Sequence, residues 1–245
     1  MIRLLAAELR LTLRILFRQP GFWVPTVLFP AMLYSFFGAN MAGTGERGAF
    51  AMASFAIYAV VGVGFYQFGV SVAQDRESPF TVWQRTLPGH AAAPWIARVA
   101  ASLIFVMIAV ALVWLAAWWI AGVTLSTPAY TRLAGACAMA SVPATLMGTA
   151  LGSVASARAA VPLSNLIFLP MAYLGGLWVP PEALPSGVAA LSVWTPTRAM
   201  GEIAWAALDG RDLPVRYLVV LGVWALAAGL MTWLAQLRNR RALFG

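Results

Sequence analysis

The chain has 245 residues, of which 62% are hydrophobic and 10% are charged. Ordinary soluble domains carry about 25% charged residues, so this composition excludes a soluble helical bundle, which would need a far larger polar shell. The formal net charge is +8, and all 16 basic residues are arginine. Basic proteins can bind nucleic acid by neutralising its phosphates, and the placement of the arginines decides whether that interpretation applies here.

Six apolar stretches account for more than half of the chain. A helix needs about 20 mostly apolar residues to cross the hydrocarbon core of a bilayer, which is about 30 Å thick. No soluble domain of useful size fits between the stretches. The sequence therefore predicts an all-α integral membrane protein with six transmembrane helices, in which residues 1–245 form a single transmembrane domain. The predicted spans are residues 22–39, 50–73, 99–122, 133–154, 159–179 and 217–236.

The arginines gather on one side of the predicted membrane. An excess of basic residues in cytoplasmic segments is the positive-inside rule. We therefore expect a multi-pass protein of the bacterial plasma membrane, with both termini in the cytoplasm and no binding to nucleic acid. Five arginines and five of the eight acidic residues then lie outside. The cytoplasmic arginines would be Arg3, Arg10, Arg14, Arg18, Arg76, Arg85, Arg98, Arg158, Arg238, Arg240 and Arg241.

Residues 1–19 predict an amphipathic helix that precedes the first span. At 100° per residue, the arginines of this segment fall on one stripe, opposite Leu5, Leu9, Leu13 and Leu16. Such a helix lies in the membrane interface, with its apolar face among the acyl chains and its basic face toward anionic headgroups. It is either a plain lipid anchor or a helix that also contacts a cytoplasmic partner.

The first predicted span contains two prolines, and the second contains three closely spaced glycines. Pro25 and Pro30 lack a backbone donor and are expected to kink the first span. Gly62, Gly64 and Gly69 in the second span form a small-residue pattern. Small residues let the backbones of two membrane helices approach closely, so we expect the second span to lie against another helix.

The segment 74–95 after the second span is the most polar long stretch between spans. Its residues 79–87 can form a short amphipathic helix, with Ser78 as N-cap and a stop at Pro88. A short helix with mixed charged and apolar residues at a membrane surface serves either local packing or docking to a partner. The residue chemistry favours neither interpretation over the other.

The segment 178–216 is too apolar for a free loop, and its prolines break it too often for a single span. Two short helices that separate near Thr195 and Pro196 fit this pattern. We expect residues 180–215 to form an external re-entrant hairpin, which must be covered by protein or line an aqueous cavity. Trp178, Trp194 and Trp205 suit the outer membrane interface.

Several classes of site are absent from the sequence. A phosphate-binding Walker loop requires lysine, and the chain has none. The single His90 and single Cys137 form no metal cluster and no disulfide framework. The spans lack the buried acidic residues that ion-coupled carriers usually need. We therefore expect no catalytic, cofactor-binding or metal site in this chain, and uphill transport would need energy from another subunit.

Two motifs resemble the type-2 permease family of ATP-binding-cassette exporters. In that family a Glu-Arg-Glu-x-Gly-Thr-Leu-Glu run is closed by Thr-Pro, and DRESPFTVWQRTLP keeps the spacing here. The run departs from the family at Pro79, where Gly is usual, and at Leu87, where Thr is usual. The matching positions are Asp75, Arg76, Glu77 and Pro88.

The second motif is LGGLWVPPEALPSGVAALSVWTPTRAMGEI, in the segment before the last span. It follows the family pattern at Gly176, Pro180, Leu184, Pro185 and Pro196. Both motifs occur in the expected order and within the expected topology. The resemblance therefore covers nearly the whole chain.

The resemblance implies a permease that works as a homodimer or heterodimer and is driven by a separate ATPase, which binds ATP. It implies coupling to the ATPase through Asp75, Arg76, Glu77, Arg85 and Pro88, with bracing by Arg10 and Arg14. It makes Tyr66, Gln67, Ser164 and Asn165 candidates for lining the translocation path. The apolar and aromatic interior favours a hydrophobic or amphipathic substrate, such as a drug, a lipid or a lipid-linked glycan.

Two rival functions share this topology. One is a membrane scaffold or assembly protein, and the other is an ion-coupled secondary carrier. A stand-alone ATPase encoded by a neighbouring gene would distinguish the permease from both.

Overall fold

The apolar stretches of the sequence fold as helices in the computed structural model, which describes residues 2–78 and 93–244. This part of the chain contains no strand. In chain order the elements are α1 (Ile2–Phe17), α2 (Pro20–Leu33), π-helix η1 (Tyr34–Gly38), α3 (Ala39–Ala42), α4 (Gly45–Gly62), π-helix η2 (Val63–Val70), α5 (Ser71–Glu77), α7 (Ala93–Ala121), α8 (Thr127–Val154), α9 (Ala160–Leu174), the 3-10 turn η3 (Pro181–Ala183), α10 (Ser186–Ser192), α11 (Pro196–Asp209) and α12 (Val215–Phe244).

Each of the six predicted stretches is helical. Four described helices are long and apolar enough to cross a membrane, namely Gly45–Glu77, Ile96–Ala121, Thr127–Val154 and Val215–Arg238. The first and fifth stretches give shorter apolar helices, Trp23–Gly38 and Ala160–Leu174. The fifth helix was expected to reach residue 179, but it ends at Leu174. The nitrogen of Gly175 still donates to the carbonyl oxygen of Met171, and the chain then leaves the helix at Gly176, which has a positive φ of 75°.

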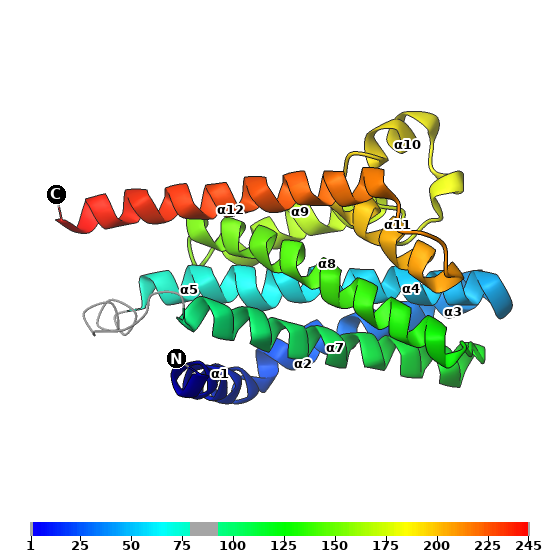
Figure 1. Cartoon of the computed structure of the whole chain (residues 1–245), viewed down its shortest axis with the longest axis horizontal. Helices are drawn as coiled ribbons and strands as arrows, with labels where there is room; N and C mark the ends of the chain where they lie inside the picture. Colours follow the sequence, from blue (N-terminus) through cyan, green and yellow to red (C-terminus); the bar gives the residue numbers. More distant parts are fainter. Residues whose placement is uncertain (1, 79–92, 245) are drawn as a thin grey trace.

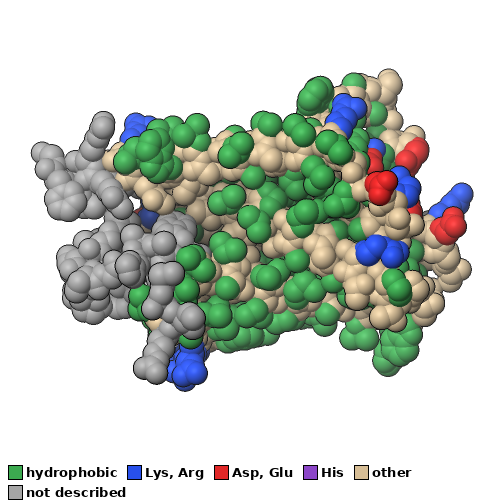
Figure 2. Space-filling model, viewed as in Figure 1, with side chains coloured by type: hydrophobic (Ala, Val, Ile, Leu, Met, Phe, Trp, Pro, Cys, Tyr) green, Lys and Arg blue, Asp and Glu red, His purple; other side chains and the backbone are tan. Residues whose placement is uncertain are grey.

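The long helices run roughly along one axis (Figure 1). Helix α1 and the end of α12 lie at one end of the bundle, together with the end of α5, and we call this the termini end. Helices α10 and α11 lie at the opposite end. Charged side chains gather toward the two ends of the face in Figure 2, and the middle of that face is largely apolar. An apolar belt between charged ends is what a membrane-spanning bundle requires.

The continuous helix α4–η2–α5 is the centre of the bundle. Within its most apolar stretch of 18 residues, 89% is buried, whereas only 22% of the corresponding stretch of α12 is buried. Helices α2, α7, α8, α9 and α11 all pack around it. The second predicted span is therefore the core of the protein, and α12 is a peripheral helix with one packed side.

Glycines let α8 contact the central helix backbone to backbone. A Cβ atom on Gly148 would lie 2.0 Å from the carbonyl oxygen of Gly64, and one on Gly152 would lie 2.2 Å from that of Gly69. The close approach expected from Gly64 and Gly69 is therefore confirmed. Gly62 differs, because its nearest neighbour is the ring of Phe168, at 3.8 Å from an added Cβ.

The first two predicted spans each contain a π-helical segment, η1 and η2. Helix α2 contains Pro25 and Pro30, and η1 begins four residues after the second proline. Proline removes a backbone donor, and π-helical turns frequently occur at functional sites. The ring centroids of Tyr34 in η1 and Phe55 in α4 lie 5.7 Å apart, so the first two predicted spans pack closely at this level.

Helix α1 packs differently from the sequence-based expectation. Its leucine face was expected among acyl chains, but Leu16 is buried and Leu9 and Leu13 pack against the protein core. The partners are mainly in α7, with fewer contacts to α2. Arg10 and Arg14 lie beside this apolar stripe and are exposed. A single apolar stripe can bury itself against protein as well as against lipid, so the sequence could not assign the partner.

Helix α11 packs between α4, α8 and α12. Trp205 was expected at the outer interface, but it is buried and stacks on Phe50 with 4.4 Å between ring centroids. Its indole nitrogen Nε1 donates to Ser54 Oγ at 2.9 Å. Trp194, just before α11, is exposed. Trp224 Nε1 of α12 donates a hydrogen bond to the backbone carbonyl oxygen of Trp194 at 2.9 Å.

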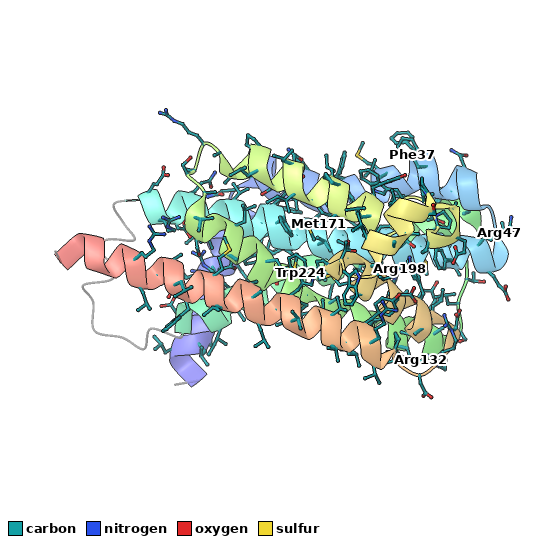
Figure 3. All side chains as sticks on the ribbon, turned by 90° about the horizontal axis from the view of Figure 1, so that it is seen from above. Phe37, Arg47, Arg132, Met171, Arg198 and Trp224 are labelled. Atoms are coloured by element: carbon teal, nitrogen blue, oxygen red, sulfur yellow. The ribbon has the colours of Figure 1, made fainter. Side chains whose placement is uncertain are left out.

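Polar contacts fix α11 at its end of the bundle. Thr195 caps the helix by accepting a hydrogen bond from the backbone nitrogen of Arg198 at 3.2 Å. Arg198 and Glu202 form an ion pair of 2.6 Å that is largely shielded from solvent. Arg132 of α8 donates from Nε to the carbonyl oxygen of Ala207 at 2.9 Å. Figure 3 shows Arg47, Arg132 and Arg198 at this same end.

Candidate coupling site and translocation path

The predicted coupling residues Asp75, Arg76 and Glu77 form the last turn of α5. They are therefore the end of the central helix and not part of a separate loop segment. Asp75 makes an ion pair with Arg98 near the start of α7. The two side chains are partly exposed, at 44% for Asp75 and 26% for Arg98. The pair ties the central helix to the third predicted span.

Arg76 binds the C-terminal end of α8. Its Nη1 atom donates to the carbonyl oxygen of Gly152 at 3.0 Å and to that of Ala155 at 3.4 Å. The last carbonyls of a helix have no partner within the helix, and the helix dipole favours a cation at that end. Arg76 thus satisfies groups that α8 leaves open.

Glu77 reaches the turn between α8 and α9. Its Oε1 atom accepts a hydrogen bond from the backbone nitrogen of Ala157 at 2.9 Å. Three consecutive side chains therefore tie the end of α5 to α7, to α8 and to the α8–α9 turn. We call Asp75, Arg76 and Glu77 with these partners the α5 clamp.

The remaining coupling candidates lie elsewhere. Arg85 and Pro88, and the helix expected over residues 79–87, fall outside the described residues. Arg10 and Arg14 lie on α1 and are exposed, and no ion pair joins either of them to another described residue. The described part of the chain therefore gathers three of the seven coupling candidates in one cluster.

The predicted path residues form one bonded pair and two buried side chains. Tyr66 of η2 donates its hydroxyl hydrogen bond to Asn165 Oδ1 of α9. Gln67 is almost fully buried, and neither atom of its amide has a hydrogen-bond partner in the described part of the chain. The buried hydroxyl of Ser164 is in the same condition. An unsatisfied buried polar group is unfavourable by about 1–3 kcal/mol. Tyr34, Trp114 and Trp178 also carry one, and those of η2 and α9 are distinguished by lying at the predicted path residues.

Aromatic rings continue this region along the central helix. The ring of Phe168 in α9 lies 4.7 Å from Tyr58, 6.0 Å from Phe65 and 5.9 Å from Tyr66. Tyr58 in turn lies 5.9 Å from Trp178. We call these five residues the aromatic column. Phe168 lies one helical turn beyond Ser164 and shares its buried face, but an apolar residue within an apolar helix carries no distinguishing signal in the sequence.

The described part of the fold defines a broad class of protein. It is a bundle of apolar helices around one buried central helix, with charged ends and a broken helical segment before the last span. This is the architecture of a multi-pass helical membrane protein.

Comparison with known sequences gives the family. A profile of the ABC-2 type transporter family matches residues 4–208, and the chain belongs to that family. It is also similar to a Bacillus subtilis (strain 168) protein named "Putative transport permease YvfS", with 21% identity over 209 residues, which covers 83% of this chain and 85% of the relative. The chain is therefore a membrane permease of the ABC-2 type, as the two sequence motifs indicated.

Proposed function

We propose that this chain is the membrane-spanning subunit of an ATP-binding-cassette exporter and is driven by a separate ATPase subunit. The observation that carries the proposal is the family match over residues 4–208. The absence of lysine from the whole sequence supports a division of labour, because a Walker phosphate loop needs that residue. The translocation path forms between two such permeases, either identical or different.

Six spans with both termini in the cytoplasm are part of this proposal. Residues 20–42 are helical without a break, which corresponds to about 35 Å at 1.5 Å per residue. Helix α9 has 15 residues, or about 22 Å, which is short for a bilayer core of about 30 Å. The start of α11 covers its end, since Thr197 Oγ1 donates to the carbonyl oxygen of Met171. Protein cover of this kind permits α10 and α11 to re-enter the outer leaflet.

Coupling in this proposal begins at the segment that follows α5, where the ATPase binds. The α5 clamp passes the movement of that segment to α7, α8 and the α8–α9 turn together. Helix α9 begins just after this turn and carries Asn165, the partner of Tyr66. Movement at the ATPase therefore reaches the interface between η2 and α9, where the candidate path residues lie.

The substrate proposed for this path is hydrophobic or amphipathic. Tyr66 and Asn165 are the accessible members of the candidate path residues. They lie beside an apolar, aromatic interior, in which the rings of Tyr58, Phe65 and Phe168 are buried. Binding sites for organic molecules are commonly apolar and aromatic with a small number of polar groups. A drug, a lipid or a lipid-linked glycan fits this chemistry better than a small ion does.

We expect the purified chain to hydrolyse no ATP, and to co-purify with a stand-alone ATP-binding-cassette ATPase from the same genome when the two are co-expressed. The measurement is phosphate release by the chain, by the ATPase and by the complex. An ATPase with its Walker lysine replaced serves as the control for contaminating activity. Hydrolysis by the chain alone, or failure of every such ATPase to co-purify, would contradict the two-subunit proposal.

A further inference from the structure

Helix α1 presents a row of exposed arginines. Arg10, Arg14 and Arg18 follow one another at intervals of four residues and are all exposed. Such neighbours are about 6 Å apart along a helix. No ion pair joins any of the three to a described residue. Three guanidinium groups in a row repel one another and favour an anionic partner. Figure 2 shows basic side chains at the lower edge of the molecule, over α1 and away from the bundle.

A groove runs beside this row. It has a volume of about 580 Å³, and the three arginines form part of its lining together with the apolar side chains Leu9, Leu13 and Phe17. No acidic residue lines it. The groove thus combines an apolar wall, about 12 Å long from Leu9 to Phe17, with a basic edge. An anionic amphiphile has the matching chemistry, and part of one acyl chain fits along this wall.

The surroundings of the row are those of the boundary between lipid headgroups and acyl chains. On the side away from the groove, the exposed apolar residues Leu4, Leu11 and Ile15 share one helical face. At the end of the groove, the ring of Phe17 lies 5.4 Å from Trp23 and 5.1 Å from Phe105, two residues of the membrane-spanning bundle. Sites that bind proteins usually have a polar rim, whereas apolar residues flank this basic row on both sides.

We propose that the groove on α1 is a binding site for an anionic phospholipid of the leaflet at the termini end. The guanidinium groups of Arg10, Arg14 and Arg18 bind the headgroup phosphate, for which the planar fork of arginine is well suited. One acyl chain lies along Leu9, Leu13 and Phe17. The row extends over about 12 Å, so a lipid with two phosphates engages more of it than a lipid with one. The inference needs only the membrane placement of the chain and is independent of the ATPase.

The test measures lipid binding to the purified full-length chain in detergent, by native mass spectrometry and by the shift in melting temperature. The probes are diphosphatidylglycerol, phosphatidylglycerol, phosphatidylcholine and inorganic phosphate. We compare wild type with Arg10→Gln/Arg14→Gln/Arg18→Gln. The control is Arg158→Gln/Arg238→Gln, which removes two exposed arginines from the same end of the bundle.

We expect wild type to bind the anionic lipids in preference to phosphatidylcholine, with diphosphatidylglycerol binding most tightly. The triple variant should bind them at least about 10-fold more weakly, while the control variant binds as wild type does. The single variant Arg14→Gln gives a smaller loss in the same direction if the triple variant proves unstable. Inorganic phosphate should produce no shift, since it offers nothing to the apolar side of the groove.

Three results would overturn the proposal. The first is equal lipid binding by wild type and by both arginine variants. The second is an equal response to inorganic phosphate, which would reduce the site to an anion site. The third is unchanged lipid binding by the triple variant together with loss of ATPase co-purification, which would make the row a protein contact, as the family resemblance suggested for Arg10 and Arg14.

Discussion

The double variant Asp75→Arg/Arg98→Asp will restore the stimulation of ATP hydrolysis that either single charge reversal removes. Asp75→Arg places a second cation beside Arg98, and Arg98→Asp places a second anion beside Asp75. Like charges at an interface are unfavourable by several kcal/mol, although solvent screens this partly exposed pair and reduces the effect. We expect each single variant to lose about 10-fold in ATPase stimulation, and Asp75→Arg/Arg98→Asp to recover most of that loss.

The measurement is ATP hydrolysis by the co-purified complex, with the melting temperature of each variant recorded alongside. The same single and double exchanges at Asp209 and Arg211 serve as the control, since that pair is 2.8 Å long, well exposed and located at the opposite end of the bundle. Those control variants should behave as wild type does. If the double exchange at Asp75 and Arg98 fails to recover activity while ATPase binding is lost, Asp75 contacts the ATPase directly, and the α5 clamp is not the coupling element.

Gly148→Ala will destabilise the protein strongly, although it adds only one methyl group. The added Cβ would lie 2.0 Å from the carbonyl oxygen of Gly64 and 3.2 Å from the Cα atom of Phe65. These neighbours are backbone atoms, so α8 and the central helix must move apart. Overpacking of this kind typically destabilises by about 1–3 kcal/mol and sometimes by more. A fall of several degrees in melting temperature is expected in detergent.

Gly135→Ala is the matched control, because Gly135 lies on the same helix and an added Cβ meets nothing within 4 Å. Alanine has the higher helix propensity, so this variant should be as stable as wild type or slightly more stable. Equal effects of the two substitutions would show that α8 does not contact the central helix through its backbone.

Local features of the sequence were sufficient for the helical segments. A run of apolar residues sets where a membrane helix can form, because the bilayer offers the backbone no other hydrogen-bond partners. All six predicted stretches are helical, and the break between α10 and α11 falls near Thr195, as the prolines indicated. Helix ends were less predictable, as the early end of α9 at Leu174 shows.

Partners distant in the sequence could not be predicted. The sequence indicated that Asp75, Arg76 and Glu77 are charged residues next to the membrane, but not that they bind Arg98, α8 and the α8–α9 turn. Likewise Tyr66 and Asn165 were separate candidates, and only the fold joins them across 99 residues. The prediction that Trp205 lies at the outer interface was wrong for the same reason, because its burial depends on Phe50 and Ser54 in another helix.

The most direct test of the permease account is transport by the purified complex of chain and ATPase in proteoliposomes, with an amphipathic fluorescent dye as the probe. We predict movement of the dye that requires ATP, the intact ATPase and this chain together. The chain alone should move none, whether or not an ion gradient is present. Transport by the chain alone under an ion gradient would show a secondary carrier, and a complex that moves no amphipathic probe while hydrolysing ATP would contradict the proposed substrate class.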